Sequence, residues 1–115
     1  GFFMAVISNI FIDAGADYTS TVTVTDGTGS AYDLTGYTAA AQIRKTYESS
    51  SATVSFTVAF ASDRTTGQLD ISLTGAQTAA IDQGRYVYDI LITSGASAKT
   101  RVVEGIATIN PRVTQ

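Results

Sequence analysis

The chain has 115 residues, of which 44% are hydrophobic and 15% charged, and its formal net charge is −3. This length suits one domain with its own core and leaves no room for a second, so we expect residues 1–115 to form a single domain. The composition is globular and excludes a disordered or collagen-like chain. The acidic balance argues against nucleic-acid binding, because phosphates would be repelled unless the few basic residues clustered on one face.

Two residue types that carry much enzyme chemistry are missing, since the chain has no histidine and no cysteine. It therefore lacks the usual general base near neutral pH, a thiol nucleophile and the usual ligands of zinc or copper. Paired carboxylates could still do acid–base work, as in glycosidases, but the acidic residues here fall in turns or alternate outward on predicted strands. We expect no catalytic residues, no cofactor, no metal and no enzyme activity.

The N-terminal segment predicts a first strand that could also serve as an interaction arm. It is apolar at Val6, Ile7, Ile10, Phe11 and Ile12. The segment is too short to span a bilayer and lacks the basic region of a signal peptide, so we expect no membrane contact. Such an apolar segment must pack somewhere, by preference on its own sheet and otherwise on a neighbouring subunit. Met4 is expected to be the natural start, with residues 1–3 added for expression.

The next predicted element is a strand over Tyr18–Thr25, where apolar or small side chains alternate with threonines. Period-two alternation is typical of a strand with one buried face. The turn formers of Asp26–Ser30 end it. Similar alternation predicts strands at Ala39–Arg44, Val54–Phe60 and Leu69–Leu73, joined by hairpin loops at residues 48–51 and 62–67.

The alternation stops between Thr74 and Asp82, which predicts a short connecting helix with Thr74 as its N-cap. Two strands follow, at residues 85–93 and 99–109. The last strand should end near Asn110, because Pro111 has no N–H to donate. About seven or eight short strands at this spacing are typical of an antiparallel all-β sandwich.

One short segment predicts the type of sandwich. Its fold-signature residues are Asp82, Gly84, Tyr86 and Tyr88. They match the corner before strand F of an immunoglobulin-like domain, where a tyrosine hydroxyl bonds to upstream backbone. Tyr88 would take the place of the usual cysteine. Alternation then buries Tyr86, Tyr88, Ile90 and Ile92, and turns Arg85, Val87, Asp89 and Leu91 outward. We predict an immunoglobulin-like antiparallel β-sandwich with one short connecting helix.

Four charged residues would lie on adjacent strands C, F and G of such a sandwich. They are Arg44, Asp89, Arg101 and Glu104. We interpret them as a cross-strand charge ladder on the outer face, worth about 0.2–1 kcal/mol per pair. A binding site made from the same charges is the alternative.

Other candidate sites have simpler structural explanations. Gly27-Thr28-Gly29 lacks the lysine and the following helix of a phosphate-binding loop, and reads as a hairpin turn. Asp26 and Asp33 could hold calcium, but their spacing matches no EF-hand loop. Tyr32, Tyr37 and Tyr47 lie in or beside loops, where they could stack on sugars, although such tyrosines more often cap a core.

Several short motifs, taken in order, carry a resemblance to a known family. They are Asp33-Leu34-Thr35-Gly36-Tyr37-Thr38, Gln42-Ile43-Arg44-Lys45, Gly84-Arg85-Tyr86-Val87-Tyr88-Asp89, Glu104-Gly105 and Asn110-Pro111-Arg112-Val113-Thr114. From Asp33 to Thr114 the chain resembles a widespread group of tailed-bacteriophage virion proteins. It is also similar to the N-terminal immunoglobulin-like domain of phage upper baseplate proteins. Physically, Gly36 and Tyr37 read as a turn into a strand, and Gly105 as a position for a bulge.

The resemblance implies a non-catalytic structural part of a bacteriophage particle, located in the capsid, neck, tail or baseplate. Its partners would be other virion proteins and copies of itself, without cofactor, nucleic acid or membrane. The alternative is a surface-exposed module that binds carbohydrate or a receptor.

Overall fold

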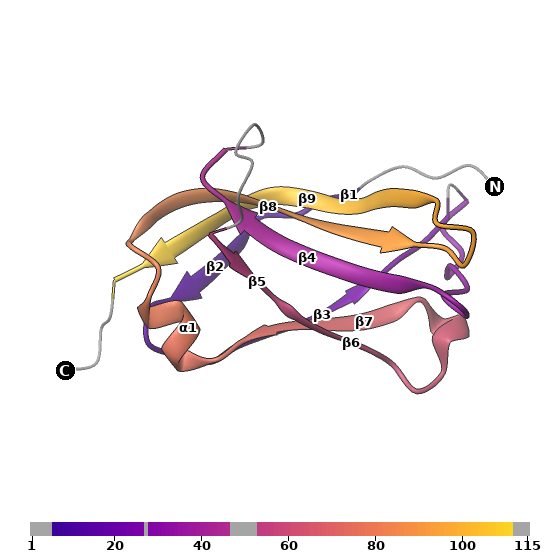
Figure 1. The fold of residues 1–115 in the computed structure, drawn as a ribbon, viewed down its shortest axis with the longest axis horizontal. Helices are drawn as coiled ribbons and strands as arrows, with labels where there is room; N and C mark the ends of the chain where they lie inside the picture. Colours follow the sequence, from indigo (N-terminus) through magenta and orange to yellow (C-terminus); the bar gives the residue numbers. More distant parts are fainter. Residues whose placement is uncertain (1–5, 27, 47–52, 112–115) are drawn as a thin grey trace.

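The computed structural model describes residues 6–26, 28–46 and 53–111. The start expected at Met4, with residues 1–3, lies outside these ranges. The same is true of Gly27, Tyr47, the polar run at residues 48–51, and residues 112–114. Parts of the predicted turn, the predicted hairpin loop and the family resemblance fall on these residues. Within the described residues the strands form two packed sheets (Figure 1).

The first sheet has six strands and the second has three. The first contains β1 (Val6–Ile7), β2 (Ile10–Asp13), β4 (Thr38–Arg44), β5 (Val54–Ser55), β8 (Gly84–Thr93) and β9 (Lys99–Asn110). Its order is β1-β9-β8-β4-β5, and β2 also pairs with β9. The second contains β3 (Tyr18–Thr23), β6 (Thr57–Phe60) and β7 (Gln68–Leu73), in the order β3-β7-β6.

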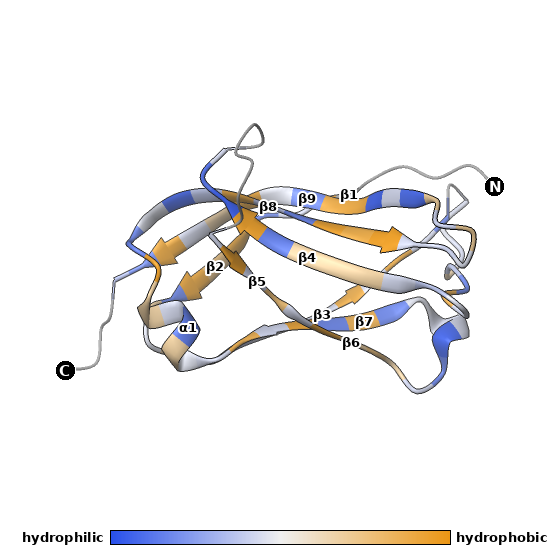
Figure 2. Ribbon diagram, viewed as in Figure 1, coloured by the Kyte–Doolittle hydropathy of each residue, from blue (hydrophilic) through white to orange (hydrophobic). Residues whose placement is uncertain are grey.

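This strand order is that of an immunoglobulin-like sandwich, as predicted. Strands β3, β7 and β6 take the places of B, E and D, while β4, β8 and β9 take those of C, F and G. Apolar residues from both sheets meet between the layers, and apolar and polar residues alternate along the strands (Figure 2). The burial of β3 follows its sequence, since its threonines are exposed and the residues between them are half-buried.

The predicted connecting helix is confirmed as α1 (Gly75–Ala79), between β7 and β8. Thr74 is its N-cap and forms a capping box with Gln77, so two otherwise unpaired backbone N–H groups are satisfied. A short 3₁₀ helix, η1 (Arg64–Thr66), lies in the loop between β6 and β7. No helix within the described ranges is long and apolar enough to cross a membrane.

The prediction of one strand from Val54 to Phe60 is wrong. The chain forms β5, which pairs with β4 of the first sheet, and then β6, which pairs with β7 of the second. Figure 1 shows this passage from one layer to the other. Phe56 lies at the change and is buried. Because inward side chains keep their alternation across the change, the sequence pattern did not reveal it.

The first sheet of the predicted antiparallel sandwich also contains parallel pairing. Strands β1 and β2 run parallel to β9, with Ile7 opposite Glu104 and Phe11 opposite Thr108. A kink separates them at Ser8 and Asn9. There the Asn9 side chain accepts a hydrogen bond from the Ile106 backbone N–H at 3.0 Å, replacing a main-chain acceptor.

Gly105 has a different role from the bulge predicted for it. The register of β8 and β9 shifts elsewhere: Ile90 lies opposite Val103 and Leu91 opposite Arg101, which leaves Val102 as the extra residue. Gly105 instead lies beneath the kink. A Cβ there would be 2.1 Å from the Ser8 carbonyl oxygen, so this crossing requires a residue without a side chain.

Candidate functional site

The fold-signature tyrosines both reach backbone carbonyls. The Tyr86 hydroxyl donates to the Asp82 carbonyl at 2.9 Å, which is the hydrogen bond expected of an immunoglobulin corner. Gly84 between them has φ +141°. Burial raises the pKa of Tyr86, and the Asp82 charge raises it further. The corner therefore stabilises the entry to β8 and offers no reactive group.

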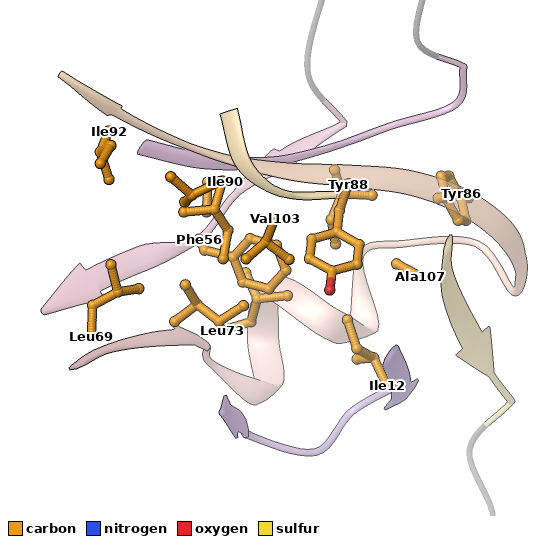
Figure 3. Packing of buried hydrophobic residues seen from close by; sticks show 14 of the residues in the cluster. Ile12, Phe56, Leu69, Leu73, Tyr86, Tyr88, Ile90, Ile92, Val103 and Ala107 are labelled. Atoms are coloured by element: carbon orange, nitrogen blue, oxygen red, sulfur yellow. The ribbon is translucent and has the colours of Figure 1, made fainter. Parts of the chain in front are cut away.

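Tyr88 connects β8 to the kink between β1 and β2 and to Phe56 in the core. Its side chain points from β8 into the space between the layers (Figure 3). Its hydroxyl donates to the Ser8 carbonyl at the kink, and its ring packs edge-on against Phe56 with 6.2 Å between centroids. Phe56 in turn lies 6.3 Å from the Tyr18 ring. Where an antibody domain has a disulfide, this chain has a row of aromatic rings from β3 to β8.

The four predicted ladder residues lie together on the first sheet. Asp89 is 3.3 Å from Arg101 and 3.8 Å from Arg44, and Arg101 is 3.3 Å from Glu104. Asp89 and Glu104 lie directly opposite each other, so Arg101 offsets a repulsion between like charges. Asp89 was expected to face solvent, but it is only 5% exposed because two guanidinium groups lie against it. The group balances its own charges.

The predicted interaction arm is divided between core and solvent. Ile12 is fully buried and Ile10 is partly buried against the core, while the Val6 side chain lies outside the described residues. Ile7 and Phe11 point away and are 75% and 67% exposed. The strands thus pack on β9 of the same chain, in line with the preferred alternative, yet two of the four described apolar side chains, Ile7 and Phe11, stay uncovered.

A third residue, which the sequence analysis missed, adds to this exposed surface. Ile106 of β9 is 40% exposed and lines a shallow groove with Asn9, Phe11, Arg85 and Thr108. Alternation along β9 could have identified it, because its neighbours Gly105 and Ala107 are buried. We call Ile7, Phe11 and Ile106 the outer patch.

A cavity of about 230 Å³ opens at the side of the sandwich, between the edges of the two sheets. Ser8 and Ile10 of the first sheet and residues 20–23 of β3 form its rim, and Ile71, Tyr88 and Val103 form its floor. We call it the side cavity. No sequence pattern predicted this cavity, because it depends on how two edges distant in sequence are placed.

The loop tyrosines contact each other. The Tyr32 and Tyr37 hydroxyls are 3.0 Å apart and the rings pack edge to face at 5.8 Å. The hydrogen bond with Tyr37, followed by burial, raises the pKa of Tyr32. Arg64 donates to the Tyr37 carbonyl at 2.7 Å and stacks on Phe60. This cluster caps the end of the sandwich.

Three aspartates form the same local motif in the turns. Asp26, Asp33 and Asp63 each accept hydrogen bonds from the backbone N–H and the hydroxyl of the threonine two residues later. These bonds, the hydroxyl contributing most, lower the pKa of each carboxyl. They explain the turn chemistry of the predicted loop at Asp26. Among the residues with described positions, no three His, Cys, Asp or Glu side chains group as metal ligands.

Comparisons with known proteins identify no family for this chain. No protein-family model matches the sequence, and a search of curated proteins gives no match. Among solved structures, the chain is similar to one described as the crystal structure of ICOS in complex with ICOS-L and an anti ICOS-L VNAR domain. The match has 11% identity and a TM-score of 0.44, over 94% of this chain and 56% of the other. The chain thus spans about half of that matched chain, and its immunoglobulin-like fold is assigned from its own strand order.

Proposed function

We propose that this domain is a non-catalytic structural component of a bacteriophage particle and works by binding other proteins. The outer patch is the observation that carries the proposal. Ile7, Phe11 and Ile106 project from neighbouring strands with 75%, 67% and 40% of their surface exposed. Large apolar side chains gathered on one face are typical of surfaces that a protein partner covers.

The arrangement of polar groups supports association without catalysis. The charged residues that lie closest together, around Asp89, are paired with one another. The sequence contains neither His nor Cys. A catalytic site usually needs a group whose chemistry is left available for a substrate, and these charges are engaged in holding adjacent strands together.

The assignment to a phage particle is supported by the resemblance between Asp33 and Thr114. The immunoglobulin-like fold that this resemblance implies is the fold the chain has. Such sandwiches serve many functions, so the fold alone does not select this one. We propose other virion proteins and copies of the same chain as partners, in the capsid, neck, tail or baseplate.

The glycan-binding alternative has less support in the described residues. Tyr32 and Tyr37, which would stack on a sugar, use their hydroxyls and one ring face on each other. Binding to a glycan array by the wild-type domain, abolished by Tyr37→Ala, would favour this alternative over the proposal.

Particles purified on a density gradient from a culture that produces this protein test the proposal. We expect mass spectrometry to find the wild-type chain in the particle band. Phe11→Ser combined with Ile106→Ser should keep the fold but leave the chain in the soluble fraction. Ala40→Ser, at an exposed position of β4, is the matched control and should be incorporated normally. Wild-type chain that is absent from the particles would refute the phage assignment, and normal incorporation of the double variant would refute the role of the outer patch.

A further inference from the structure

Strand β3 leaves one side of the second sheet open. It pairs with β7, and no described residue pairs with its other side. The Val24 N–H donates to the Gly67 carbonyl at 2.7 Å, in the register that places Thr23 opposite Gln68. Main-chain groups alternate in direction along an antiparallel strand. Those of Ser20 and Val22 therefore point toward β7, and those of Thr19, Thr21 and Thr23 point outward.

This edge has none of the usual protection against strand pairing. Its sequence, YTSTVT, contains no charge and no proline, and its six residues pair with β7 without a bulge. Natural edge strands are commonly interrupted or carry a charged residue. The neighbouring edge of the first sheet follows that pattern, because the kink at Ser8 and Asn9 interrupts it and Asp13 ends it. Of the two edges that flank the side cavity, β3 is the continuous one.

The side cavity lies directly behind this edge. Ile10, Val22, Ile71 and Val103 line it with apolar side chains, and no charged side chain lines it. Small polar side chains complete the lining at Ser8, Ser20, Thr21 and Thr23. Its volume of about 230 Å³ exceeds the ~150 Å³ of an apolar cavity that binds benzene. It is therefore large enough for one aromatic or branched aliphatic side chain. A charged side chain would lose its hydration there without gaining a partner.

We propose that an extended segment of a partner protein pairs with β3 as a fourth strand of the second sheet and inserts one apolar side chain into the side cavity. The outward main-chain groups of the three threonines would form the new ladder. The occupant must be a strand because a regular row of N–H and C=O groups is matched by another strand. The inference rests on the proposed function and specifies one kind of partner.

A second copy pairing through its own β3 fits less well. Its side chains on the cavity side would be Tyr18, Ser20 and Val22. Ser20 and Val22 are too small to fill the space, and Tyr18 packs against Phe56 in the core of its own chain. A partner segment with a large apolar residue between smaller ones would fill it.

Amide hydrogen exchange measured by NMR on the isolated chain tests whether the edge is open. The N–H groups of Thr19, Thr21 and Thr23 should exchange at least roughly tenfold faster than those of Ser20 and Val22, which bond to β7. Equal protection of all five would show that the edge is already occupied and would overturn the proposal. A dimer in sedimentation with this edge protected would assign the edge to a second copy.

A synthetic peptide tests the cavity. The probe is acetyl-Thr-Val-Thr-Phe-Thr-Val-Thr-amide, and the control peptide has Lys in place of the central Phe. Only the Phe peptide should slow exchange at Thr19, Thr21 and Thr23. Ser20→Leu, which fills the side cavity from within, should weaken binding by roughly tenfold or more. Ser55→Leu, on the opposite edge of the molecule, is the matched control and should bind like wild type. Equal binding to wild type and Ser20→Leu, or no binding of the Phe peptide, would overturn the proposal.

The variants distinguish failure of the partner-strand proposal from failure of the proposed function. Ser20→Leu alters the side cavity and leaves the outer patch intact, whereas the Phe11→Ser and Ile106→Ser double variant does the reverse. If Ser20→Leu enters particles normally and only the double variant is lost, the structural role stands and the partner-strand inference does not. Thr21→Pro, which removes one outward donor while sparing the β7 ladder, should match Ser20→Leu in the peptide assay.

Discussion

Gly105 shows how one residue determines the path of a whole segment. Its missing side chain makes room for the Ser8 carbonyl, which then accepts the Tyr88 hydroxyl. Ile7 and Phe11 lie on either side of the kink at Ser8 with their side chains exposed. A conventional reading of the sequence assigns this glycine to a bulge, because a close approach between segments distant in sequence leaves no local pattern.

Gly105→Ala should therefore destabilise the domain. A Cβ 2.1 Å from the Ser8 carbonyl oxygen would force the kink away from β9, at a cost of about 1–3 kcal/mol in the free energy of unfolding. Urea denaturation followed by circular dichroism measures this. Gly95→Ala is the matched control, because a Cβ there meets nothing within 4 Å, and it should change stability by less than ~0.5 kcal/mol. Equal effects of the two changes would show that the close approach is not what Gly105 provides.

Tyr86 gives a prediction about alkaline stability. Burial and the Asp82 charge raise its pKa above the ordinary value of 10.0, so the folded state binds this proton more tightly than the unfolded state. The resulting stability is complete below about pH 10 and is lost as pH rises through the folded pKa. Tyr86→Phe should cost about 0.5–1.5 kcal/mol at neutral pH, through the lost bond to the Asp82 carbonyl. Its stability should fall less steeply than that of wild type above about pH 10. Parallel pH curves for the two proteins would contradict this.

At the scale of elements, the charge group couples three strands. Asp89 on β8 faces Glu104 on β9 across the ladder, and Arg101 contacts both carboxylates. The sequence indicated which residues would meet. It did not reveal that Asp89 would be buried, because alternation predicts the direction of a side chain and not what covers it.

Arg101→Gln should cost about 1–3 kcal/mol, since it removes the nearer partner of a buried carboxylate and leaves two acidic residues opposed. Glu104→Gln should offset part of this loss in the Arg101→Gln background while having little effect, or a slight cost, on its own. A double-mutant cycle from thermal unfolding gives the coupling. Additive effects would mean that Arg101 does not relieve a repulsion between Asp89 and Glu104.

Considering the whole molecule, the sequence was most informative where side chains alternate. Period two located the strands, the break after Leu73 located α1, and the tyrosine pattern located the corner. It was least informative where the backbone changes partners. The passage of Phe56 between sheets keeps the same alternation, and the parallel course of β2 beside β9 depends on contacts between residues far apart in sequence. The arm was identified as apolar, but only the fold shows that Ile7 and Phe11 are its exposed side chains.

The same distinction applies to the candidate sites. Residue types and spacing predicted the charge group and argued against catalytic chemistry. The outer patch and the side cavity depend on the relative placement of sheet edges, so they emerge only from the three-dimensional arrangement. Together they describe a sandwich with exposed apolar side chains on β1, β2 and β9 and, within the described residues, an unpaired edge at β3.

Hydrogen exchange measured by mass spectrometry, on the free chain and on the chain within purified particles, tests this account most directly. We predict slower exchange in the particle at residues 6–13, 18–23 and 103–110, which carry the outer patch and the open edge, and little change at β4 and β5. Protection confined to β4 and β5, or no difference between the free and assembled chain, would contradict it.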